Sequence, residues 1–115
     1  VEIIKNPEAN REWHIMLAAV AGIYLIADVQ TSKQYIGSAY GEKGILGRWI
    51  EYARSVHGGN SLLKELVSNN PDYARNFMFT ILQTLPKTLT QKEVIAYEVL
   101  WKNKLGSRAF GLNIN

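Results

Sequence analysis

Two short segments rich in β-branched and aromatic residues constrain the fold of this chain most. They span Gly22–Val29 and Gln34–Ala39, with polar residues at positions 31–33 between them. Residues of this kind favour extended strands, and a short polar connection is typical of a turn, so the pattern predicts a β-hairpin. A third such segment, Phe77–Leu85, is closed by Pro86 and predicts a third strand.

Apolar residues at helical spacing flank the predicted hairpin. The sequence predicts a helix over residues 7–20, with Asn6 as its N-cap and Pro7 at its first position. Its apolar stripe consists of Trp13, Met16, Leu17 and Val20. The glycine-rich residues 41–47 predict an irregular loop, and a helix follows it up to Gly58. The apolar face of that helix is expected at Leu46, Trp49, Ile50, Ala53 and His57.

The remaining helices complete a mixed pattern. Ser61–Ser68 predicts a short helix, and the capping box at residues 90–93 opens a helix that runs to about Leu105. The order of elements predicts a small α/β domain with a central three-stranded antiparallel sheet flanked by helices. The length of 115 residues suits one domain, which we expect over residues 21–115. Residues 1–20 would be a helical extension or the remnant of a preceding domain.

Composition excludes several classes of protein. The chain has no cysteine, which removes disulfide frameworks, zinc-thiolate sites and thiol catalysis. Its longest uncharged run, His14–Ala27, is shorter than a membrane span, and no segment resembles a secretion leader. We therefore expect a cytoplasmic protein with no membrane partner. The formal net charge of +3 arises in the second half, and Lys102, Lys104 and Arg108 fit phosphate contacts or a solvated basic face.

One acidic residue breaks the pattern of the last helix. Glu98 falls on the stripe formed by Val94, Tyr97, Trp101 and Leu105. A carboxylate on an apolar face is costly to desolvate unless a cation, a metal or a set of donors satisfies it. The sequence leaves open a structural salt bridge, an edge position in contact with water, or a functional site.

A second group of polar residues is expected on one side of the hairpin. If the strands pair around an even-numbered loop, Tyr24 and Tyr35 project from the same face. Arg48 and Tyr52 are four residues apart and share a helix face away from the apolar stripe. A guanidinium beside phenols suits a phosphate oxyanion, although such residues are also ordinary on strands and exposed helices.

Taken in order, these residues form a known pattern. Gly22-Ile23-Tyr24, Tyr35-Ile36-Gly37, Arg48-Trp49, Glu98 and Gly111-Leu112-Asn113 follow one another at intervals that resemble the GIY-YIG nuclease family. The resemblance covers residues 22–113. It implies a DNA endonuclease that hydrolyses phosphodiester bonds with a single divalent metal ion, Mg²⁺ or Mn²⁺.

The resemblance also implies a role for individual residues. Glu98 matches the metal ligand of the family, and Arg48 matches the arginine that binds the scissile phosphate. Tyr24 matches the tyrosine that activates the attacking water, and Tyr35 matches the second tyrosine of the site. Asn113 matches a late asparagine that supports the geometry of the site.

The chain departs from the family at two positions. Tyr52 lies where homing-endonuclease members carry histidine, whereas the incision subunit of bacterial nucleotide excision repair has tyrosine there. Asn60 stands where homing members often have another histidine. His57 is a candidate to replace the missing proton carrier.

DNA is the partner that the resemblance implies. The residues expected to contact it are Gly37, His57, Asn60, Lys102, Arg108 and Asn113. The modest net charge predicts weak, salt-sensitive binding by this module, so target choice is expected to come from an additional targeting domain or from oligomerisation. The alternative function is a catalytically inactive nucleic-acid-binding or scaffold domain that retains the fold.

Overall fold

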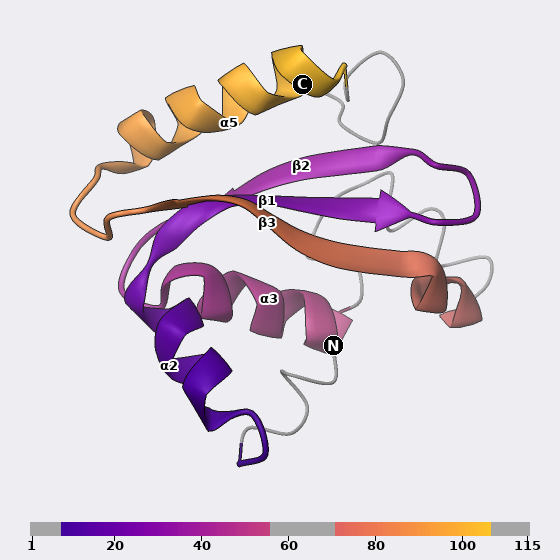
Figure 1. Cartoon of the computed structure of the whole chain (residues 1–115), viewed down its shortest axis with the longest axis horizontal. Coiled ribbons are helices and arrows are strands. Elements are labelled where there is room, and N and C mark those ends of the chain that lie inside the picture. The colour runs from indigo at the N-terminus through magenta and orange to yellow at the C-terminus, as the bar shows by residue number, and fades with distance from the viewer. Residues whose placement is uncertain (1–7, 56–70, 107–115) are drawn as a thin grey trace.

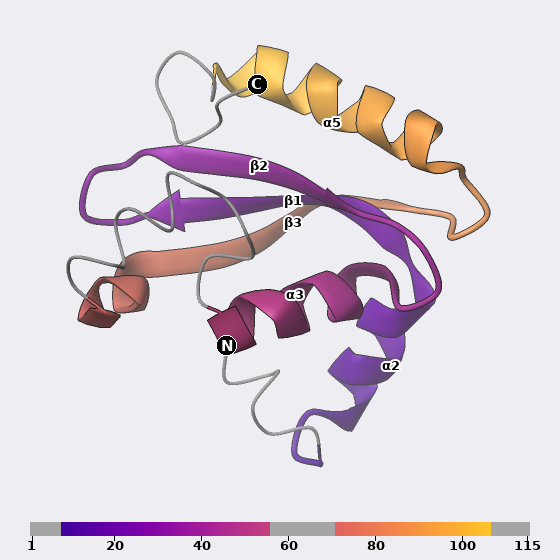
Figure 2. The ribbon, with the colours of Figure 1, turned by 180° about the vertical axis from the view of Figure 1, so that it is seen from behind.

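A three-stranded antiparallel sheet lies between two layers of helices. The computed structural model describes residues 8–55 and 71–106. Its elements are α2 (Arg11–Ala19), β1 (Ala21–Asp28), β2 (Gln34–Ala39), α3 (Gly44–Ser55), the 3-10 helix η1 (Pro71–Asn76), β3 (Phe77–Leu85) and α5 (Gln91–Leu105). The strand order is β2-β1-β3, with α5 over one face of the sheet and α3 over the other (Figure 1 and, from behind, Figure 2). The predicted α/β class and antiparallel sheet are confirmed.

The register between β1 and β2 decides which side chains share a face. Tyr24 lies opposite Gly37, and Ile26 lies opposite Tyr35. Facing residues project from the same side of a sheet, so Tyr24 and Tyr35 both point toward α3, as the hairpin pattern predicts. Ser38, opposite Ile23, projects toward α5 instead.

A β-bulge in β3 switches the faces of that strand. Tyr24 pairs with Ile81, whereas the preceding Ile23 pairs with Gln83, so one extra residue is inserted in β3. Before this point the odd-numbered Phe77, Phe79 and Ile81 pack with the cluster around Tyr24, and beyond it Leu85 packs on the α5 side. The bulge lets one strand supply apolar side chains to both layers.

Each face of the sheet has its own hydrophobic cluster. The cluster under α3 contains Leu17, Tyr24, Ile26, Ala39, Ile45 and Tyr52. The cluster under α5 contains Ala21, Ile23, Ile36, Leu85 and Val94. Leu17 of α2 is fully buried in the same cluster as Tyr24, so α2 contributes to the core between the sheet and α3. No helix among the described residues is both long and apolar enough to cross a bilayer.

Several sequence-based expectations about the helices were wrong. The predicted stripe of the first helix is mostly exposed, since Trp13 and Met16 face outward and only Leu17 is buried among the residues of α2. This short helix packs on α3 and therefore buries a narrow face. In α5, Tyr97 and Leu105 are exposed, and the buried face turns toward Val94 and Lys102.

Helix α3 begins earlier than expected, and its buried face is shifted toward Ile45 and Tyr52, although Leu46 and Trp49 of the expected face pack against the core. It starts at Gly44, inside the predicted loop. Gly44 has a φ of 54°, and a Cβ atom there would lie 2.1 Å from the carbonyl oxygen of Val20, so this start requires glycine. Tyr52, which was expected away from the apolar stripe, is only 2% exposed. The aromatic side chains of the sheet offer it a buried environment that helical periodicity does not reveal.

The remaining boundaries follow the sequence closely. Strands β2 and β3 and the last helix have the predicted limits, and the capping box is present, with Glu93 N donating to Thr90 Oγ1 at 3.2 Å. The 3-10 helix η1 was not predicted. The predicted helix Ser61–Ser68 lies outside the described residues.

A buried aspartate fixes the end of the hairpin. The Asp28 side chain is fully buried, and its Oδ1 accepts a hydrogen bond of 2.9 Å from Gln30 N. Its Oδ2 accepts a hydrogen bond from the Tyr73 hydroxyl, which ties η1 to the turn. This bond is the main reason why the pKa of Tyr73 is raised.

We predict that Tyr73→Phe lowers the free energy of unfolding by about 1–3 kcal/mol, since it leaves one oxygen of a buried carboxylate without its donor. Urea denaturation measures this change. Tyr97→Phe, at an exposed position of α5, is the control and should change stability by less than about 0.5 kcal/mol. Equal effects of the two substitutions would contradict the role given to Asp28.

Candidate functional site

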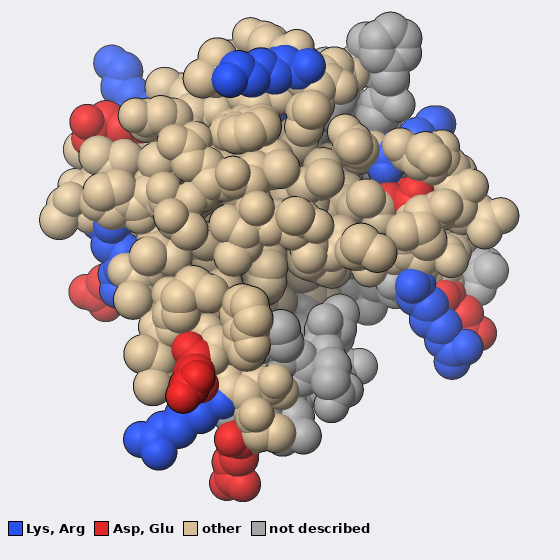
Figure 3. All heavy atoms as spheres, viewed as in Figure 1, with Lys and Arg blue, Asp and Glu red and all other residues tan. Residues whose placement is uncertain are grey.

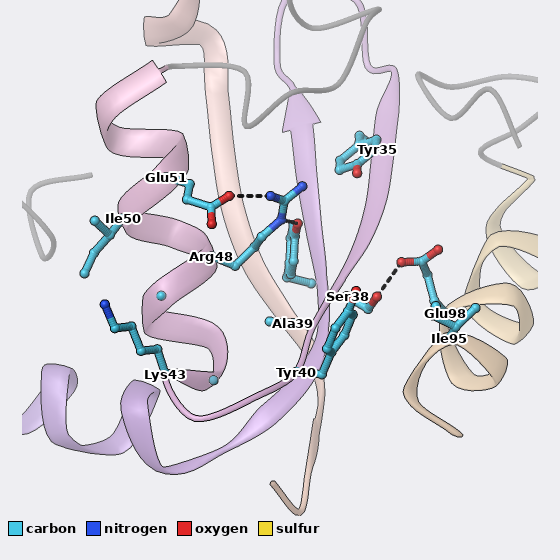
Figure 4. Close-up of a pocket in the computed structure, with 13 residues that line it drawn as sticks. Tyr35, Ser38, Ala39, Tyr40, Lys43, Arg48, Ile50, Glu51, Ile95 and Glu98 are labelled. Carbon is cyan, nitrogen blue, oxygen red and sulfur yellow. Dashed lines mark hydrogen bonds and ion pairs between the residues drawn. The ribbon is translucent and has the colours of Figure 1, made fainter. Parts of the chain in front are cut away.

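A pocket of about 640 Å³ opens along the free edge of β2. Tyr24, Tyr35 and residues of α3 line it from one side of the sheet, and Ser38 and Glu98 line it from the other (Figure 4). Because β2 is an edge strand, a single pocket can reach side chains on both faces of the sheet. The edge thereby brings the polar groups of two helices to one place.

Tyr24 is the floor of this pocket and part of the hydrophobic core at once. Its ring has no exposed surface and lies 6.5 Å from the ring of Tyr35 and 5.9 Å from that of Tyr52, measured between centroids. Its hydroxyl donates a hydrogen bond of 3.2 Å to the Tyr52 hydroxyl. Tyr52 therefore supports Tyr24 from behind.

Gly37 makes room for the ring of Tyr24. A Cβ atom at this position would lie 2.4 Å from the Tyr24 hydroxyl oxygen and 2.5 Å from Cζ. No side chain could occupy that space without moving the ring. Gly37 is thus needed for the packing of Tyr24, and this geometry does not favour the predicted contact with DNA.

Burial governs the ionisation of the two inner tyrosines. It raises the pKa of Tyr24 well above its usual range, and the neighbouring Tyr35 adds to this effect. The positive charge of Arg48 and the hydrogen bond that Arg48 donates to the Tyr24 hydroxyl offset it in part. Burial likewise raises the pKa of Tyr52. Both phenols are protonated at neutral pH in the free protein.

Arg48 lies over these phenols and is held in place by several contacts. Its Nε donates to the Tyr24 hydroxyl at 3.3 Å, and its guanidinium carbon lies 5.1 Å from the centre of the Tyr52 ring. Its Nη1 forms an ion pair of 2.6 Å with Glu51 Oε2. Figure 4 shows the guanidinium between Glu51 and Tyr35.

Glu98 faces the pocket and is already partnered. Its Oε1 accepts a hydrogen bond of 2.6 Å from Ser38 Oγ, and its Oε2 lies 2.7 Å from Lys102 Nζ. The side chain is 16% exposed, so the acid is neither free in solvent nor sealed inside the protein. The structure combines two of the alternatives that the sequence left open, a salt bridge and a position in contact with water.

The donor set fits a hard divalent cation bound mainly through water. No three carboxylate or histidine side chains gather around one point within residues 8–55 and 71–106. Glu98 and Ser38 nevertheless offer only oxygen atoms, and they face an open pocket. Mg²⁺ commonly binds through one or two carboxylates together with water and phosphate oxygens, and a single carboxylate such as Glu98 is compatible with this mode of binding.

Four predicted site residues line the pocket, whereas Gly37, Tyr52 and Lys102 do not. Tyr24, Tyr35, Arg48 and Glu98 all line the pocket. Lys102 is 5% exposed and is not among the lining residues, which disfavours the predicted contact with DNA. The side chains of His57, Asn60, Arg108 and Asn113 lie outside the described residues.

Sequence reasoning missed several residues of the pocket. They are Ser38, Tyr40, Lys43 and Glu51. Strand alternation places Ser38 on the face of Ile36, and helical spacing places Glu51 one turn after Arg48, so both positions carry a signal. These positions can be assigned to the pocket only when it is known that β2 is an edge strand, because the pocket lies along that edge.

The charged residues that line the pocket are balanced in sign. Two cations, Lys43 and Arg48, and two carboxylates, Glu51 and Glu98, line it. On the face shown in Figure 3, side chains of both signs lie mainly at the margins around a wide uncharged surface. The described residues of this face therefore form no continuous basic band.

We predict that stability falls above about pH 10, where unfolded tyrosines lose their protons. The pKa values of Tyr24 and Tyr52 are higher in the folded than in the unfolded protein. Their contribution to the free energy of unfolding is therefore complete below about pH 10 and is lost as pH rises from there through their pKa values in the folded protein. Each group contributes a slope of about 1.4 kcal/mol per pH unit. Urea denaturation between pH 8 and 11 should reveal it, and Tyr52→Phe should reduce it. A slope that Tyr52→Phe leaves unchanged would refute this account.

We also predict that Gly37→Ala destabilises the protein by about 1–3 kcal/mol, since the methyl group displaces a fully packed ring. The aromatic circular dichroism of the tyrosine cluster should change with it. Ser38→Ala, on the opposite face of the same strand, should keep that aromatic signal. Retention of both stability and signal by Gly37→Ala would show that Tyr24 does not need this space.

The fold is similar to that of two solved structures of one catalytic domain. The catalytic domain of the intron endonuclease I-TevI, in a form with one glutamate replaced by alanine, matches with a TM-score of 0.66 and 23% identity, over 84% of this chain and 94% of that chain. A structure of the catalytic domain of the homing endonuclease I-TevI matches with a TM-score of 0.60 and 26% identity, over 83% of this chain and 98% of that chain. No protein-family model and no curated protein matches the sequence.

These likenesses agree with the architecture derived from the chain itself. The hairpin that carries the two tyrosine motifs supplies the central strand and one edge strand of a three-stranded antiparallel sheet with helices on both faces. I-TevI is a GIY-YIG homing endonuclease. On its sheet topology, its paired tyrosines and this likeness, the chain is a GIY-YIG-like domain.

Proposed function

We propose that this domain is a DNA endonuclease that hydrolyses phosphodiester bonds with the help of one divalent metal ion. The observation that carries the proposal is the meeting of Tyr24, Tyr35, Arg48 and Glu98 around one pocket. The likeness to the I-TevI catalytic domain supports the same reaction class. We further propose that the enzyme acts in the cytoplasm and that target choice comes from a separate domain or from oligomerisation.

The reaction needs a positioned water, a neutralised phosphate and a stabilised leaving oxygen. Arg48 binds the scissile phosphate, because its planar guanidinium can donate two parallel hydrogen bonds to phosphate oxygens. Glu98, with Ser38 as its hydrogen-bond donor, would hold Mg²⁺ or Mn²⁺. When bound, the ion would neutralise charge on the phosphate and on the leaving oxygen.

Tyr24 orients the attacking water in this proposal. Its raised pKa disfavours a phenolate that would remove a proton from water in the free enzyme. The hydroxyl donates one hydrogen bond to Tyr52 and accepts one from Arg48. Its remaining capacity is to accept a hydrogen bond from water, which aligns that water with the phosphate.

Arg48 controls access to Tyr24. The tyrosine has no exposed surface, and the guanidinium lies against its hydroxyl. A phosphate oxygen carries charge and is a stronger acceptor than a phenol. We expect the substrate to draw Arg48 toward itself and so to uncover Tyr24, which would couple phosphate binding to the positioning of water.

The proposal predicts that Glu98→Ala and Arg48→Ala each lower Mg²⁺-dependent nicking of supercoiled plasmid by about 100-fold or more, since each removes charge stabilisation that strengthens in the transition state. Gel electrophoresis of the plasmid measures the loss. Circular dichroism should show that both variants remain folded. Activity like that of the wild type in either variant would refute the assignment.

Matched controls are available outside the pocket. Glu12→Ala removes an exposed carboxylate of α2, and Arg75→Ala removes an exposed arginine of η1, so both should keep nicking activity. If the wild-type domain binds DNA but nicks none with Mg²⁺ or Mn²⁺, the alternative function applies. The chain would then be an inactive nucleic-acid-binding or scaffold domain.

A further inference from the structure

Lys102 has an unusual environment for a lysine. It is 5% exposed on α5, whereas Lys104, two residues later, is exposed. Lysine is almost never fully buried unless its charge is paired. Here the partner is Glu98, one helical turn earlier, with 2.7 Å between Nζ and Oε2.

Stability alone does not account for this ion pair. Replacing a buried ion pair by apolar residues of similar volume is often neutral or stabilising. The position lies on the face of α5 that packs against the sheet through Val94 and Trp101, where an apolar side chain would fit. The chain nevertheless places an ammonium group on the one acid that α5 presents to the pocket.

The pair changes what Glu98 can bind. Both carboxylate oxygens are engaged, Oε1 by the Ser38 hydroxyl and Oε2 by the ammonium group. A second cation on this carboxylate must share it with Lys102, and two cations on one carboxylate repel each other. Partial burial preserves that repulsion, since charges away from bulk water are less screened.

We propose that Lys102 is a resident counter-ion that weakens the affinity of Glu98 for a divalent metal ion in the free protein. This inference rests on the proposed function, because it takes Glu98 to be the metal ligand. Lys102 is a positioning residue and does not touch the substrate. Its ammonium group occupies one carboxylate oxygen of Glu98 while no metal is bound.

The test is a Mn²⁺ titration of the free protein, followed by electron paramagnetic resonance. Lys102→Met removes the competing charge and keeps a flexible side chain of similar length, so it should tighten Mn²⁺ binding roughly tenfold or more. Lys102→Gln removes the charge but can still donate to Glu98, and should change affinity in the same direction. If Lys102→Met does not fold, Lys102→Gln provides the same comparison of Mn²⁺ affinity.

The controls separate this effect from a structural role. Lys104→Met makes the same change of charge on the exposed side of α5 and should alter Mn²⁺ affinity by less than about twofold, since exposed charges are screened. When Glu98→Gln is combined with Lys102→Met, the gain in Mn²⁺ affinity of the single Lys102→Met variant should be lost. If Lys102 only held Glu98 in place, its removal would leave Mn²⁺ binding unchanged or weaker, and either result in a folded variant would overturn the inference.

The inference and the proposed function can fail separately. Plasmid nicking by the wild type at high Mn²⁺ tests the function. Tighter Mn²⁺ binding by the Lys102 variants in a protein that nicks no DNA would support the counter-ion and refute the nuclease. Nicking by the wild type together with unchanged Mn²⁺ affinity in the variants would refute the counter-ion alone.

Discussion

The pairing of β1 with β2 is the constraint on which the rest of the structure depends. It sets Tyr24 opposite Gly37, which leaves space for the tyrosine ring, and it turns Tyr35 to the same face. A shift of one residue would exchange the two faces and send both phenols toward α5. Asp28 holds this register at the turn, since its backbone N–H donates to the Lys33 carbonyl at 2.8 Å while its side chain is anchored to η1.

The site is inseparable from the hydrophobic core. Tyr24 and Tyr52 are core residues by burial and site residues by their hydroxyl groups. Core packing fixes the rings, so the positions of the hydroxyls are set before any ligand arrives. This rigidity suits a role in orienting a water molecule. The same burial raises the pKa of both phenols, so the packing that fixes them also suppresses their ionisation.

The sheet and the shared face of Tyr24 and Tyr35 could be predicted because they depend on local patterns, whereas Arg48 and Glu98 were assigned to the site by the family resemblance. Strand alternation and the length of the turn suffice to place Tyr24 and Tyr35 together. The burial of Lys102 and Tyr52 could not be predicted in this way, because it depends on which neighbours a helix meets. The bulge in β3 is equally hidden, since Phe77–Leu85 reads as one regular strand. Periodicity describes one element at a time, whereas these features arise between elements.

On the proposed function, two internal ion pairs would determine which ligands the site binds. Arg48 is held by Glu51, and Glu98 is held by Lys102. A phosphate that arrives alone must compete with Glu51, and a divalent cation that arrives alone must compete with Lys102. When the phosphate and the metal ion bind together, their opposite charges neutralise each other. The pairs of Arg48 with Glu51 and of Glu98 with Lys102 are then replaced by Arg48 with the phosphate and Glu98 with the metal ion, so the number of paired charges is kept. On the proposed function, the pocket thus favours a metal ion and a phosphodiester together over either one alone.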